Sequence, residues 1–281
     1  MSFSRQVKEQ LATHKAETTN QRRRELQGFY WMLGTPSEDQ ILFASENILV
    51  AKMIIRLLGE FFHGLYSFKV QYKGRFRKVH YQITLYGKDQ SFFKIKELEK
   101  KQERAAFLRA AFLARGSLTD PKKGYHLELR CQDFNTYILL QDLLSSFGVE
   151  AKGITRKEVF FLYLKDGEMI SDFLKIVGAV GYMLAFEETR VIKEMKNMAN
   201  RRNNCDLANL DKIIKSSAKQ VRIIQRIGIP KLPQNLRELA TLRVENPELS
   251  LQELGELCSP SLKKAAVNYR FKKIIALGGE E

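Results

Sequence analysis

The spacing of apolar residues changes several times along the chain, and each change predicts a different secondary structure. Where apolar residues recur at intervals of three and four, we expect a helix. Where they alternate with polar residues, we expect a strand that buries one face. In the first half, this pattern predicts helices over 22–33 and 48–62, a short strand over 41–45, and a hairpin of strands over 67–73 and 78–85.

The same order of elements recurs in the second half. A helix over 104–115 precedes a strand over 125–131, a helix over 134–147, strands over 149–155 and 158–165, and a helix over 167–177. Two rounds of helix, strand, helix and hairpin indicate an internally duplicated α+β domain. The second hairpin differs from the first, because Val159 to Leu164 is almost entirely apolar. Its outer face is therefore expected to be covered.

Beyond residue 180 the pattern is helical only. Residues 181–228 are expected to form helix, with a break at Asn200–Asn204. Pro230 and Pro233, which follow Gly228, then predict the end of the helix and a domain boundary. The expected division is an α+β domain over residues 1–200, a helical linker over 201–229 and a small all-helical domain over 230–281.

The last segment has the pattern of a helix-turn-helix module. Helices are predicted over 235–244, over 251–257 and from the following turn to about residue 277. Ser250 and Glu253 have the spacing of a capping box, and Leu249 and Leu254 have that of a hydrophobic staple. A short helix, a tight turn and a longer basic helix are typical of helix-turn-helix DNA binding.

The third of these helices has two different faces. Val267, Phe271 and Ile274 fall within one narrow arc and are expected to pack inward. An outward asparagine can bond an adenine edge, while lysine and arginine hold phosphates. The candidate DNA-binding residues are Lys263, Lys264, Ala265, Asn268, Tyr269, Arg270, Lys272 and Lys273. The alternative is an ordinary solvated basic helix on a helical bundle.

Charge narrows the choice of partner. The chain has 47 Lys and Arg against 32 Asp and Glu, a formal net charge of +15. Such a balance favours a polyanion, most simply nucleic acid, with an anionic membrane surface as the rival. No apolar run approaches the roughly 20 residues of a membrane span, and the first residues lack the apolar core of a signal peptide. The three cysteines lie far apart and form no disulfide framework, so a reducing cytoplasm is expected. With DNA as the partner, the protein is expected at the nucleoid.

Two nine-residue segments, Leu26–Gly34 and Leu108–Gly116, resemble the LAGLIDADG motif, in which an apolar helix seam is closed by glycine. The eighth residue of that motif is normally a metal-binding acid. Here it is Leu33 in the first copy and Arg115 in the second. Leucine cannot ligate a divalent cation and arginine repels one. The resemblance therefore implies a homing-endonuclease-like scaffold without nuclease chemistry.

Further segments extend the resemblance over nearly the whole chain. Residues 106–114, 116–117, 120–121, 123–129, 200–201, 204–205, 208–209, 251–257 and 267–268 resemble blocks of the WhiA family of bacterial regulators. Members of this family combine a LAGLIDADG-like domain with a C-terminal helix-turn-helix. They act in cell division, chromosome segregation and, where it occurs, sporulation, by binding DNA. Lys263, where the family usually carries Ser, Thr or Gly, and Tyr269, where it often has His, depart from the pattern, so no target sequence is carried over.

The polar face of the first hairpin is a second candidate surface. In a LAGLIDADG nuclease this face lies on DNA, and the alternative is an ordinary solvated sheet face. The candidate DNA-backbone residues are Lys69, Gln71, Lys73, Arg75, Arg77 and His80, with Gln82 beside them and Arg115 as a further phosphate contact. The histidines show no metal spacing and no phosphate-cradling glycine loop is present, so no metal, cofactor or catalytic residue is expected.

The sequence thus predicts a non-catalytic, WhiA-type transcriptional regulator that binds double-stranded DNA. The transcription machinery or another regulator is a further candidate partner, and neither a membrane nor a small-molecule substrate is expected. One alternative is a metal-dependent endonuclease, with Asp39 and Asp120 as a displaced metal site. The other is a protein-interaction adaptor of the transcription machinery.

Overall fold

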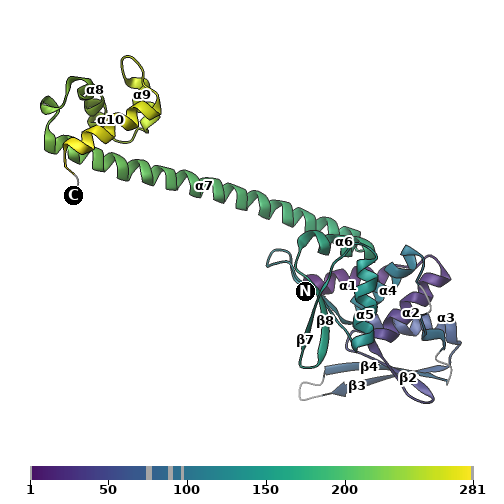
Figure 1. Cartoon of the computed structure of the whole chain (residues 1–281). Helices are drawn as coiled ribbons and strands as arrows, with labels where there is room; N and C mark the ends of the chain where they lie inside the picture. Colours follow the sequence, from purple (N-terminus) through teal and green to yellow (C-terminus); the bar gives the residue numbers. More distant parts are fainter. Residues whose placement is uncertain (1, 74–77, 88–90, 96–97, 280–281) are drawn as a thin grey trace. The chain divides into compact units, whose positions relative to one another are not determined.

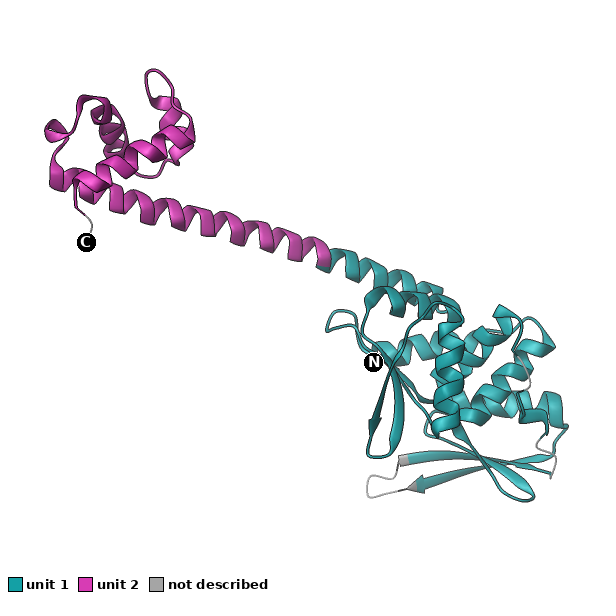
Figure 2. Ribbon diagram, in the orientation of Figure 1, with its two compact units in different colours: residues 1–193 teal, residues 194–281 magenta. Residues whose placement is uncertain are grey.

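A computed structural model describes residues 2–279 apart from 74–77, 88–90 and 96–97. Contacts divide the chain into two compact units, residues 1–193 and residues 194–281 (Figure 2). The three-part division expected from the sequence, 1–200, 201–229 and 230–281, stays a prediction beside this contact-based division.

The first unit contains two rounds of the same arrangement (Figure 1). The first round is α1 (Phe3–Thr13), α2 (Thr19–Leu33), β1 (Gly34–Pro36), β2 (Gln40–Ser45), α3 (Ile48–Phe62), β3 (Tyr66–Lys73), β4 (Lys78–Tyr86) and the 3-10 turn η1 (Ser91–Phe93). The second is α4 (Lys101–Arg115), β5 (Gly116–Leu118), β6 (Leu127–Arg130), α5 (Phe134–Ser145), β7 (Lys152–Arg156), β8 (Val159–Leu164) and α6 (Gly167–Val177). The two antiparallel sheets have the equivalent strand orders β1-β2-β4-β3 and β5-β6-β8-β7, which confirms the internal duplication.

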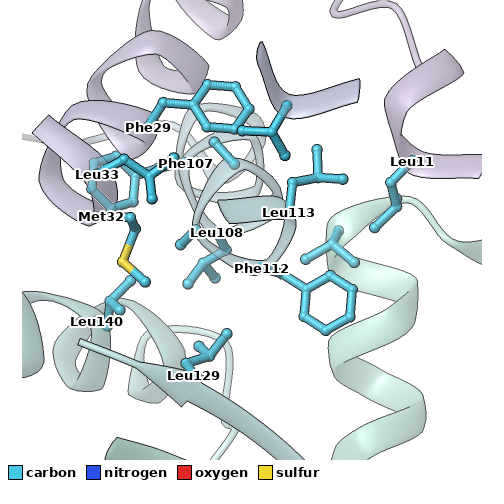
Figure 3. Close-up of a cluster of buried hydrophobic side chains, with 14 of the residues drawn as sticks. Leu11, Phe29, Met32, Leu33, Phe107, Leu108, Phe112, Leu113, Leu129 and Leu140 are labelled. Atoms are coloured by element: carbon cyan, nitrogen blue, oxygen red, sulfur yellow. The ribbon is translucent and has the colours of Figure 1, made fainter. Parts of the chain in front are cut away.

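The core of the first unit lies along α2 and α4, the helices that carry the two nine-residue segments. Phe29, Leu108 and Phe112 are fully buried there (Figure 3). Gly28 permits the close approach of the helices, because an added Cβ would lie 2.8 Å from both the Ala110 Cβ and the Phe107 carbonyl oxygen. The two segments therefore form a tightly packed helix seam.

A buried ion pair crosses this seam. The Arg109 Nε donates to Glu25 Oε1 at 2.9 Å, and Arg109 Nη1 donates to the Val177 carbonyl at 3.0 Å. Burial raises the pKa of the Glu25 carboxyl, and the Arg109 guanidinium opposes that shift. Because both side chains are almost inaccessible to water, each depends on the other for its charge to be tolerated.

One helix and two strands of the first unit were not predicted, nor was the 3-10 turn η1. Helix α1 has a mainly polar sequence, which did not predict a helix. Phe3, Val7 and Leu11 nevertheless have the four-residue spacing of a buried stripe, and Val7 and Leu11 are fully buried. Strands β1 and β5 have three residues each, which is too short for an alternating pattern to be recognised.

The two hairpins also differ from expectation in what covers them. The register of β3 with β4 places Phe68 opposite Ile83 and Val70 opposite Tyr81, on the face predicted to be apolar. Ile83 is buried, yet Phe68 and Val70 are 42% and 45% exposed on β3, the edge strand of the sheet. On the outer face of β8, the ring of Phe161 is half-buried beneath the Arg156 guanidinium. That face is partly covered by the long side chains of Arg156 and Lys165, which lie over the rings of Phe161 and Tyr163.

The second unit is entirely helical. Helix α7 (Val180–Ile227) begins in the first unit and continues into the second, followed by η2 (Ile229–Lys231), α8 (Gln234–Glu245), α9 (Leu251–Leu257) and α10 (Lys264–Leu277). The predicted break at Asn200–Asn204 is wrong, since α7 is continuous there. That segment holds neither Gly nor Pro, and solvated Asn and Arg cost a helix little. Gly228, with φ of 84°, ends the helix where the sequence predicted.

Helices α8, α9 and α10 share a core with the end of α7. Leu239, Leu254 and Phe271 are buried in this cluster together with Ile223 and Ile224. The last turns of α7 are therefore part of the small domain's core, whereas the sequence assigned them to a linker.

Candidate nucleic-acid interface

The helix-turn-helix geometry depends on how α9 begins and how the turn after it closes. Glu253 N donates to Ser250 Oγ at 3.3 Å, and Ser250 N donates to Glu253 Oε2 at 2.7 Å, which confirms the predicted capping box. The Glu253 carboxylate accepts hydrogen bonds from the backbone N–H and, secondarily, the side chain of Ser250, and these lower the pKa of Glu253. Near the other end, Leu262 N donates to the Gly255 carbonyl at 2.8 Å. An added Cβ at Gly255 would lie 2.1 Å from the Leu262 carbonyl oxygen, so the turn requires glycine there.

A buried arginine that sequence reasoning missed fixes the loop between α8 and α9. Arg243 Nη1 donates to the Leu249 carbonyl at 2.6 Å, and its guanidinium lies 5.4 Å from the ring centroid of Phe271. Burial lowers the pKa of Arg243 to about 10. From the sequence alone, an arginine in this helix is expected to be exposed to solvent. Only the folded loop after α8 shows that Arg243 is buried.

The outward face of α10 presents the predicted residues to solvent. Lys263, Lys264, Ala265, Asn268, Tyr269, Lys272 and Lys273 are exposed, and Arg270 is half-buried. Val267, Phe271 and Ile274 are buried, as their position within one arc of the helix predicted. The Lys273 Nζ lies 4.8 Å from the Tyr269 ring centroid, so an aromatic ring and an ammonium are held together on the exposed side.

The polar face of the first hairpin brings several predicted residues together. Register places Gln71 opposite His80 and Lys69 opposite Gln82 on one face of the sheet. Lys69 is exposed, while Gln71 and His80 are half-buried. Lys73 is the last residue of β3, and Arg75 and Arg77 lie outside the described residues.

The two motif helices end at a shared cavity of about 400 Å³. Leu33 ends α2 and is buried in the core (Figure 3), and Arg115 ends α4 and is half-buried. Both line the cavity, together with Lys8, Glu46, His80 and Arg130. The positions of a metal-binding acid pair are thus taken by one apolar and one cationic side chain.

The candidate displaced acids are not among the residues that line this cavity. Asp120 Oδ1 accepts a hydrogen bond from Lys122 N at 2.9 Å, as part of the local turn, and the Asp39 carbonyl accepts one from Gly87 N. Within the described ranges, no three His, Cys, Asp or Glu side chains are grouped as a metal ion would need. Among the same residues, no helix is long and apolar enough to cross a bilayer.

Comparisons with known proteins agree with both units. A family model described as the WhiA LAGLIDADG-like domain matches residues 104–196, and one described as the WhiA C-terminal HTH domain matches residues 199–277. The "Probable cell division protein WhiA" of Ruminiclostridium cellulolyticum is 34% identical over 300 residues, covering 98% of this chain and 96% of the relative. The chain belongs to the WhiA family. A WhiA relative from Clostridium botulinum is 32% identical over 310 residues, covering 100% of this chain and 98% of the relative.

Solved structures of WhiA proteins share the fold of this chain. Full-length WhiA from Thermotoga maritima matches with a TM-score of 0.66 at 27% identity, covering all of both chains. The N-terminal LAGLIDADG domain of a WhiA protein matches with a TM-score of 0.55 at 24% identity, covering 63% of this chain and 92% of that one. The predicted fold class is confirmed: a duplicated, LAGLIDADG-like α+β domain followed by an all-helical helix-turn-helix domain.

Proposed function

We propose that this WhiA-family protein is a DNA-binding transcriptional regulator without catalytic activity, which acts in cell division, chromosome segregation and, where it occurs, sporulation. The observation that carries the proposal is α10, whose inner face is fully buried while Asn268, Tyr269 and Lys272 point into solvent. Double-stranded DNA is the partner that such a helix fits, with its side chains in the major groove. As a DNA-binding regulator, the protein is proposed to act in the cytoplasm at the nucleoid.

The absence of catalysis is proposed from the cavity at the ends of the motif helices. A LAGLIDADG nuclease needs carboxylates there to hold the ions that activate water. Leu33 and Arg115 supply no ligand oxygen, and a guanidinium repels a divalent cation. We expect purified protein to leave supercoiled and linear DNA intact with magnesium or manganese. Metal-dependent nicking that survives repurification and is abolished by Asp39→Asn or Asp120→Asn would instead support an endonuclease.

Genome-wide crosslinking of the tagged protein tests the regulatory role. We expect enrichment at discrete sites near genes of division and chromosome segregation, and loss of that enrichment in a double variant, Asn268→Ala with Lys272→Ala. An adaptor of the transcription machinery would remain at promoters in this variant, because protein contacts would hold it there. Steeply salt-dependent binding to naked DNA would argue against the adaptor.

The polar face of the first hairpin is proposed to add affinity for the DNA backbone. Each phosphate contact adds roughly 0.9 to the slope of log affinity against log salt. A quadruple change to alanine, at Lys69, Lys73, Arg75 and Arg77, should flatten that slope by about two to four units. An unchanged slope would make this an ordinary solvated face, and a protein partner would then be the better hypothesis for the first unit.

A further inference from the structure

The cavity at the ends of the two motif helices gathers cationic side chains from three separate elements. Lys8 comes from α1, Arg115 from the end of α4 and Arg130 from the end of β6. The acid that lines the cavity, Glu46, lies 3.6 Å from His80 Nε2 and has a side chain 59% exposed to water. Lys8 and Arg115 are half-buried, whereas Arg130 and Glu46 are exposed. Among the side chains that line the cavity, three cations therefore face one carboxylate, and that carboxylate lies beside a histidine.

These cations lack carboxylate partners. In the part of the chain that the structure describes, no carboxylate oxygen lies within ion-pairing distance of Lys8, Arg115 or Arg130. Lys8 Nζ donates to the Leu113 carbonyl at 3.1 Å and lies 5.5 Å from the ring centroid of Phe112. One neutral carbonyl and one aromatic ring only partly replace the water that an ammonium loses on burial.

Burial of Lys8 and Arg115 disfavours their charged forms. Burial lowers the pKa of Lys8 to about 8. Burial also lowers the pKa of Arg115, and the nearby charge of Arg130 lowers it further. An anion in the cavity would neutralise the half-buried charges of Lys8 and Arg115 and offset the repulsion between Arg115 and Arg130.

We propose that this cavity binds a phosphate group, in place of the metal ions that the equivalent position holds in a nuclease. Two guanidinium groups offer planar, paired donors that match the oxygens of a phosphate, and the ammonium adds a point charge. A volume of about 400 Å³ is within the range of small-ligand sites and exceeds what a single phosphate needs. The phosphate can be carried by a free phosphoester or by the DNA backbone, and this binding does not depend on how α10 reads bases.

Calorimetric titration of the full chain with inorganic phosphate, against chloride at equal ionic strength, tests the proposal. The variant that removes the site is Arg115→Gln with Arg130→Gln. The matched control is Lys122→Gln with Lys123→Gln, which removes the same charge from two exposed lysines of the same unit. Phosphate affinity should fall about tenfold or more in the site variant, because charged hydrogen bonds are lost, and stay within about twofold in the control.

Three further measurements distinguish loss of the phosphate site from loss of the fold. The site variant should be folded and at least as heat-stable as the wild type in chloride, since like-charge repulsion has been removed. Arg115→Lys should retain part of the affinity, because it keeps the charge and loses the paired donors. In spectra of ¹⁵N-arginine protein, the Nε–H signals that phosphate shifts should include those that disappear in the site variant.

A duplex of random sequence distinguishes the two sources of phosphate. If the DNA backbone occupies the cavity, saturating duplex displaces inorganic phosphate, and the site variant lowers the salt slope by roughly 0.9 per lost contact. If a free phosphoester is the ligand, phosphate still binds the DNA complex, a nucleoside monophosphate competes with it, and the slope is unchanged. Equal phosphate affinity in wild type and site variant would overturn the proposal. So would the absence of millimolar phosphate binding together with an unchanged salt slope.

Discussion

Asn268 offers the sharpest test of whether α10 reads bases. Its side chain is exposed on α10, one residue after the buried Val267, and it is expected to contact a base edge only when DNA is bound. Asn268→Ala should therefore change the free energy of unfolding by no more than about 0.5 kcal/mol, as for other surface substitutions. Loss of one bidentate base contact costs about 1–3 kcal/mol in binding, or roughly a 5- to 140-fold rise in Kd.

The assay compares two duplexes at one fixed salt concentration, by fluorescence anisotropy. One carries a site recovered by crosslinking and the other is its scrambled sequence. Asn268→Ala should weaken binding to the specific duplex and leave the scrambled one almost unchanged, because phosphate contacts carry non-specific affinity. Lys272→Ala should weaken both alike. Asn235→Ala, the same change at an exposed position of α8, is the matched control and should alter neither.

One result would refute this reasoning about α10. If Asn268→Ala and Lys272→Ala reduce specific and scrambled binding by the same factor, α10 does not read bases. Specificity would then have to come from the shape of the DNA or from contacts made by the first unit.

Three further predictions concern packing and chemistry inside the two units. Gly255→Ala should destabilise the second unit by about 1–3 kcal/mol in denaturant unfolding, since its Cβ would meet the Leu262 carbonyl oxygen, whereas Gly124→Ala, where nothing lies within 4 Å, should be neutral. Arg109→Met should cost the first unit about 3–5 kcal/mol at neutral pH by leaving Glu25 buried and unpaired. Without Arg109 the pKa of Glu25 rises further above its value in the unfolded state, so the folded state binds the proton more readily than the unfolded state does. The loss of unfolding free energy caused by Arg109→Met should therefore become smaller as pH falls, and a loss that does not depend on pH would contradict this. Burial raises the pKa of the Cys131 thiol to about 12, so iodoacetamide at pH 8 should alkylate the exposed Cys205 and spare Cys131 until the protein unfolds; equal labelling would contradict the buried position.

Local pattern was sufficient for most of the secondary structure. Residues 48–62, 167–177 and 251–257 form helices with the bounds that the sequence predicted, because helical periodicity and end signals are written within each segment. The capping box at Ser250 and the inward set Val267, Phe271 and Ile274 were predictable for the same reason. The substitution of both motif acids, by Leu33 and Arg115, was also visible in the sequence alone.

Burial and long-range contact were decided only by the tertiary structure. An alternating strand pattern says which side chains share a face but not whether a helix covers that face, so the exposure of Phe68 was not predictable. Arg243 and Gly255 acquire their roles from a carbonyl of a following loop or turn that only folding brings into contact with them. The cationic cavity joins Lys8, Arg115 and Arg130, which come from three separate elements, and no periodicity relates them. The sequence therefore determined the elements and the lost metal ligands, while packing of those elements determined which charges lie together, because burial and electrostatics depend on distance in space.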